Sequence, residues 1–111
     1  MIHVIMGLKG SGKTKKLTYD ISYKVRLVDS KEYGINSVEM LKGFLSGLHA
    51  GNFDITNVYI DNLYKTIGDD RAAGEEFILW CAKFAEDNKM NITITVSADP
   101  AEASEAVKKY L

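Results

Sequence analysis

Near its start the chain reads Ile2-His3-Val4-Ile5-Met6, followed by Gly7-Leu8-Lys9-Gly10-Ser11-Gly12-Lys13-Thr14. The first stretch is almost continuously apolar, which is typical of a strand covered on both faces. The second is a glycine-rich turn that ends in a lysine and a hydroxyl residue. Along the rest of the chain expected strands alternate with expected helices, which predicts an α/β fold with a mainly parallel sheet. The turn then lies at the carboxyl end of its strand, where ligands bind in such sheets.

This turn matches the Walker A pattern G-x-x-x-x-G-K-[ST] in full. Glycines allow backbone N–H groups to converge on phosphate oxygens, and the helix that follows adds positive potential. The residues expected to bind a nucleotide are Gly7, Gly10, Ser11, Gly12, Lys13 and Thr14. Lys13 supplies a mobile, catalytic cation for the β- and γ-phosphates, and the Thr14 hydroxyl supplies a ligand for Mg²⁺. The alternative is a glycine-rich β-turn with a surface lysine.

A second acid is expected on the metal side of this site. Val58-Tyr59-Ile60-Asp61 is an apolar strand that ends in an aspartate, as a Walker B element does. The Asp61 carboxylate would hold Mg²⁺ through water, opposite Thr14, and so take part in catalysis. The alternative is that Asp61 only caps a turn. The next residue, Asn62, can orient water but cannot accept its proton, which favours slow or absent hydrolysis.

Further polar residues follow the last expected strand. Ser97 and Asp99 are candidates for contacting a γ-phosphate, although helix capping by Asp99 is the favoured interpretation. Asn36 and Glu39 form a predicted capping box at the start of a helix. Hydrophobic periodicity predicts strands over about 2–6, 24–28, 57–61 and 92–96, and helices over about 37–51, 72–88 and 100–110. In residues 15–30 the apolar positions fit both the strand period of two and the helix period of about 3.6. We interpret this segment as a short helix and then a strand.

Composition sets the remaining bounds. The 111 residues, 46% of them hydrophobic, make up a single domain, 1–111, whose small core favours a homodimer. A formal charge of −1 gives no strong signal for nucleic acid, and no apolar stretch approaches the ~20 residues that span a membrane. A single cysteine, Cys81, and the lack of a signal peptide predict a cytoplasmic protein.

The chain resembles the P-loop nucleoside triphosphatases, and more closely a group of short bacterial ATP-binding proteins sometimes labelled after twitching-motility ATPases. The segments that carry the resemblance are Met6 to Lys16, Lys24 to Asp29, Glu32 to Ile35, Phe53 to Thr56 and Tyr59 to Asp61. The resemblance implies a three-layer P-loop domain with a small, mainly parallel sheet. It also implies ATP or GTP, with Mg²⁺, as the ligand.

Three functions remain open at this point. The first is a nucleotide-binding protein with slow or no hydrolysis. The second is a small phosphotransferase of nucleoside-kinase type, which requires an acceptor pocket and a lid with arginines; the chain has only Arg26 and Arg71. The third is a non-enzymatic module whose nucleotide site regulates the binding of a partner.

Overall fold

A computed structural model describes residues 1–7 and 28–111, which form an α/β domain around a small parallel sheet. The strands are β1 (Ile2–Gly7), β2 (Asn57–Ile60) and β3 (Asn91–Ser97), in the order β1-β3-β2. Both pairings are parallel. These strands confirm three of the four predicted strands, those over about 2–6, 57–61 and 92–96, to within a residue or two. Parallel strands require crossover connections, which the intervening segments supply.

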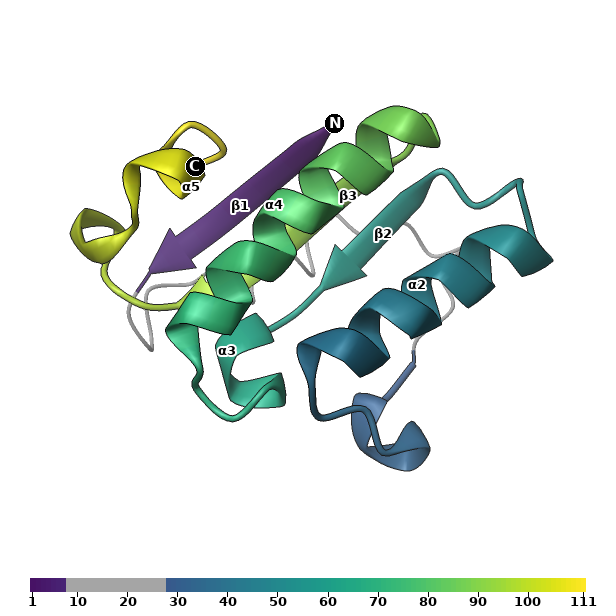
Figure 1. The fold of residues 1–111 in the computed structure, drawn as a ribbon, viewed down its shortest axis with the longest axis horizontal. Coiled ribbons are helices and arrows are strands. Elements are labelled where there is room, and N and C mark those ends of the chain that lie inside the picture. The colour runs from purple at the N-terminus through teal and green to yellow at the C-terminus, as the bar shows by residue number, and fades with distance from the viewer. Residues whose placement is uncertain (8–27) are drawn as a thin grey trace.

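Four α-helices and two 3₁₀-helices accompany the sheet in the described residues. They are η1 (Ser30–Tyr33), α2 (Val38–Gly51), α3 (Leu63–Thr66), α4 (Arg71–Asp87), η2 (Pro100–Glu102) and α5 (Glu105–Lys108). Figure 1 shows α4 running roughly along the strands in front of β3, with α2 beyond β2 and α5 beyond β1. The expected strand over 24–28 and the helix before it fall on residues outside the described ones, except for Val28, which is in no strand.

The core lies between the sheet and α4. Alternate residues of β3, namely Ile92, Ile94 and Val96, are fully buried, and they share one face of the sheet with Ile2 and Val4. From α4 the buried residues are Gly74, Phe77, Ile78, Cys81 and Ala85. The apolar side chains on one face of the strands therefore pack against those on one face of α4 in a single cluster. Leu41 and Leu45 of α2 and Val107 of α5 belong to the same cluster.

Two helix boundaries differ from the prediction. The α2 N-cap is Ser37, whose side chain accepts a hydrogen bond from Met40 N at 3.2 Å, so the predicted capping box of Asn36 and Glu39 is wrong by one residue. The single helix expected over 100–110 is also wrong. Asp99 caps only η2, and Ala103 and Ser104 are extended before α5 begins. The break allows Tyr110 to reach the edge of β1, where its carbonyl oxygen accepts from Val4 N at 2.8 Å.

Candidate functional site

The carboxyl edge of the sheet gathers the described residues of the predicted site. Gly7, the first residue of the glycine-rich turn, ends β1 and lies in register with Ser97 of β3. The Gly7 carbonyl oxygen accepts from Ala98 N at 3.1 Å. Asp61 directly follows Ile60, which pairs with Ile94 of β3. The site residues Gly10, Ser11, Gly12, Lys13 and Thr14 lie outside the described residues. The turn therefore starts at the same edge as Asp61, with β3 between them.

The side chain of Thr95 connects β3 to Asp61. Thr95 is fully buried, and its hydroxyl donates a hydrogen bond to Oδ1 of Asp61 at 2.5 Å. The same hydroxyl accepts from the backbone N–H of Asn62 at 2.7 Å. Both contacts join residues more than thirty positions apart in the sequence. They fix the chain at the point where β2 ends and hold the exposed Asp61 carboxylate beside the sheet.

Asn62 is held by a second hydroxyl of β3. Its backbone is left-handed, with φ 58° and ψ 55°, a conformation that asparagine adopts more readily than most residues. The Ser97 hydroxyl donates to Oδ1 of Asn62 at 3.2 Å. The Asn62 carbonyl oxygen accepts from Thr66 N, also at 3.2 Å, and so starts α3. The amide side chain thus lies at the carboxyl edge, next to the strand end that pairs with Gly7.

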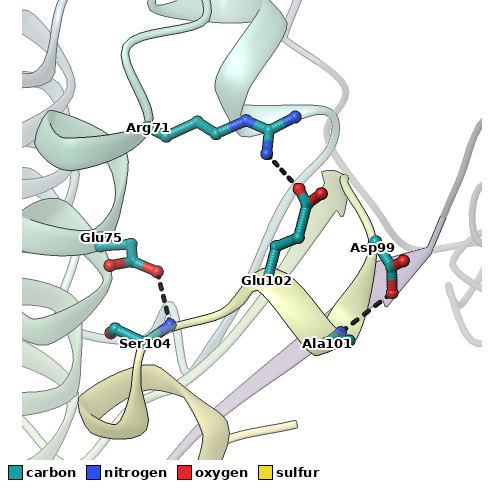
Figure 2. Close-up of polar contacts among 6 residues, drawn as sticks. All are labelled: Arg71, Glu75, Asp99, Ala101, Glu102 and Ser104. Carbon is teal, nitrogen blue, oxygen red and sulfur yellow. Dashed lines mark hydrogen bonds and ion pairs between the residues drawn. The ribbon is translucent and has the colours of Figure 1, made fainter.

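The other acids near this edge take structural roles. The Asp99 carboxylate accepts from Ala101 N at 3.0 Å, as predicted for a helix cap, and Asp70 caps α4 by accepting from Ala73 N at 3.1 Å. The Glu75 carboxylate accepts from Ser104 N at 3.0 Å, which ties α4 to the C-terminal segment. Figure 2 shows the Asp99 and Glu75 contacts. These hydrogen bonds give the three carboxylates positions that capping and packing explain.

Within the part of the chain that the structure describes, Arg71 is the single arginine. Its guanidinium donates to Oε2 of Glu102 at 2.5 Å, and this hydrogen bond raises the pKa of Arg71 further (Figure 2). Both side chains are more than half exposed. The pair lines an open cavity of about 270 Å³ together with Met6, Tyr64, Ala98 and neighbouring residues. Arg71 is therefore engaged with Glu102.

The aromatic side chains along α4 take packing roles. Tyr64 is buried beneath α4, and this burial raises the pKa of its phenol. Trp80 stacks on Phe84 with ring centroids 4.8 Å apart, and on Phe77 at 5.9 Å. These rings fill the space along α4, so base stacking is not needed to explain them.

Sequence reasoning found Asp61, Asn62 and Ser97 but missed Thr95. The segment Ile92-Thr93-Ile94-Thr95-Val96-Ser97 alternates strictly, which places its three hydroxyl residues on one face of the sheet. That alternation was the available signal. The partners of Thr95, however, are set by strand register, which the sequence does not show.

Within residues 1–7 and 28–111, no group of three or more His, Cys, Asp or Glu side chains is arranged to hold a metal ion. No helix in the same part of the chain is long and apolar enough to cross a membrane. Comparisons of the chain with protein-family models, with curated proteins and with solved structures find no match.

Proposed function

We propose that this protein binds a nucleoside triphosphate, ATP or GTP, together with Mg²⁺, and hydrolyses it slowly or not at all. The glycine-rich turn from Gly7 to Thr14 would bind the phosphates, with Lys13 as their cation. Thr14 and Asp61 would hold the metal ion from opposite sides. We propose in addition that the α/β domain has the three-layer architecture of P-loop proteins.

The observation that carries the proposal is that Gly7, the first residue of the glycine-rich turn, and Asp61 lie at the same edge of the sheet. Neighbouring strands lie about 4.8 Å apart, so the ends of β1 and β2, which flank β3, are separated by roughly 10 Å. A phosphate group, a metal ion and a bridging water fit between groups at that separation. Asp61 and the start of the turn are 54 residues apart in the sequence, from position 7 to 61, and only the fold brings them together.

Asn62 supports the slow-hydrolysis part of the proposal. A glutamate in this position would accept a proton from the attacking water, whereas a neutral amide cannot. Among the described acids, Asp70, Glu75 and Asp99 are engaged in capping or in the contact with Ser104. This favours a binding protein, and it also fits a module whose nucleotide regulates a partner.

The test is nucleotide affinity, measured by isothermal titration with ATP and GTP in the presence of Mg²⁺. Lys13→Ala should weaken binding about 10- to 100-fold, because a charge-assisted hydrogen bond contributes roughly 1.5–3 kcal/mol. The matched control is Lys16→Ala, which removes the same charge just beyond the motif and should bind as the parent does. Equal affinities in the parent and Lys13→Ala would refute the proposal.

Two measurements separate the remaining alternatives. Phosphate release at the level of Lys13→Ala, despite tight binding by the parent, would favour a regulatory module over an NTPase. Turnover that requires an added nucleoside would instead favour a phosphotransferase. Native mass spectrometry tests the predicted homodimer and any co-purified nucleotide in one experiment.

A further inference from the structure

Among the described residues, Thr95 is unusual because its side chain is polar and yet fully buried. It lies between Ile94 and Val96, which are also fully buried. A hydroxyl taken from water without partners costs about 1–3 kcal/mol by mutational comparison. A valine of nearly the same shape would avoid that cost, so the hydroxyl needs an explanation.

The chemistry of its partners fixes the direction of each hydrogen bond. A hydroxyl has one proton to donate and two lone pairs to accept with. The backbone N–H of Asn62 can only donate, so it occupies a lone pair of Thr95, at 2.7 Å. An ionised carboxylate can only accept, so the Thr95 proton points at Oδ1 of Asp61, at 2.5 Å.

These two bonds constrain Asp61 through both its backbone and its side chain. The first fixes the peptide that follows Asp61, and the second fixes one oxygen of its carboxylate. With Oδ1 held, the direction of the second oxygen, Oδ2, is restricted as well. An exposed carboxylate without such a contact would rotate freely and would lose that freedom when it bound a metal ion.

We infer that Thr95 is a positioning residue, whose hydroxyl orients the Asp61 carboxylate toward the Mg²⁺ of the bound nucleotide. This inference rests on the proposed function. Thr95 touches neither metal nor nucleotide in this arrangement; it acts through Asp61. The contribution expected from preorganising one side chain corresponds to an approximately 3- to 10-fold tighter binding of Mg²⁺.

The test compares Thr95→Val, which keeps the shape and loses the hydroxyl, with Thr95→Ser, which keeps the hydroxyl and loses the methyl group. The readout is the Mg²⁺ concentration that gives half of the metal-dependent gain in ATP affinity. We expect this concentration to rise about 3- to 10-fold in Thr95→Val and to stay near the parental value in Thr95→Ser. ATP affinity in EDTA should be the same in all three proteins.

A merely structural role for Thr95 predicts a different result. Urea unfolding would then show lower stability in both variants, while the Mg²⁺ dependence would match that of the parent. That outcome overturns the inference and leaves the proposed function standing. If Thr95→Val does not fold, Thr95→Ala provides the same comparison with a smaller side chain. A parent protein that binds ATP without any effect of Mg²⁺ would instead refute the metal role of Asp61, and the inference with it.

Discussion

Gly74 of α4 lies against the ring of Tyr64, and its replacement by alanine tests how tightly α3 is packed behind the candidate site. A Cβ atom at Gly74 would lie 2.5 Å from Cε1 and 2.8 Å from Cδ1 of Tyr64. Ordinary van der Waals contacts begin at about 3.4 Å, so the ring would have to move by roughly 1 Å. Tyr64 is 4% exposed, and its helix begins directly after Asn62.

Two opposing effects set the size of the change. Alanine is favoured over glycine inside a helix by up to about 1 kcal/mol. Overpacking of a filled core costs about 1–3 kcal/mol. Because the Tyr64 ring is enclosed, the second effect should win, and Gly74→Ala should lower the free energy of unfolding by about 1–2 kcal/mol. The displaced ring should also disturb the α3 segment that starts at Asn62.

Urea unfolding followed by the fluorescence of Trp80, the single tryptophan, measures this directly. The matched control is Gly43→Ala in α2, where an added Cβ would meet no atom within 4 Å. That variant should be more stable than the parent by up to about 1 kcal/mol, because only the helix preference changes. If Gly74→Ala stabilises the protein as Gly43→Ala does, the packing argument is refuted.

Three further predictions concern other parts of the described structure. Ser37→Ala should lower the free energy of unfolding by about 1 kcal/mol, and Asn36→Ala should change it little, as urea unfolding would show. Burial raises the pKa of the Cys81 thiol, so its contribution to stability is complete below the pKa of the unfolded thiol, about 8.5, and is lost at higher pH. Unfolding measured from pH 7 to 10 should show that loss, and Cys81→Ala should show less of it. Arg71→Met and Glu102→Gln should leave thermal stability almost unchanged, because the ion pair is exposed; a clear drop in either melting temperature would contradict this.

Sequence alone was sufficient for the three described strands and the two long helices, because their apolar residues form a continuous run or follow a clear period. The sequence did not identify the correct helix start where two neighbouring residues are equally good N-caps. Asn36 and Ser37 are both good N-caps, and the structure uses the second. The C-terminal helix failed for another reason. Glu75 accepts from Ser104 N, and Val107 is fully buried, so contacts with α4 override the local tendency to continue the helix.

The candidate site divides in the same way. Asp61 and Asn62 were predicted because each follows an apolar strand near a recognisable motif. Thr95 was not, because a threonine in a β-branched strand is already explained by its β propensity. Its role depends on a partner 34 residues away, and that pairing appears only when the strands are placed in register.

The register itself links the site to the core. On β3, Ile94 and Val96 belong to the apolar core cluster, while Thr95 and Ser97 lie on the alternate face and reach Asp61 and Asn62. Because side chains alternate with a period of two, a slip of one residue would exchange the two faces. The hydroxyls would then enter the core, and the apolar residues would replace them at the carboxyl edge. The burial of the core therefore enforces the register that brings Thr95 to Asp61 and Ser97 to Asn62.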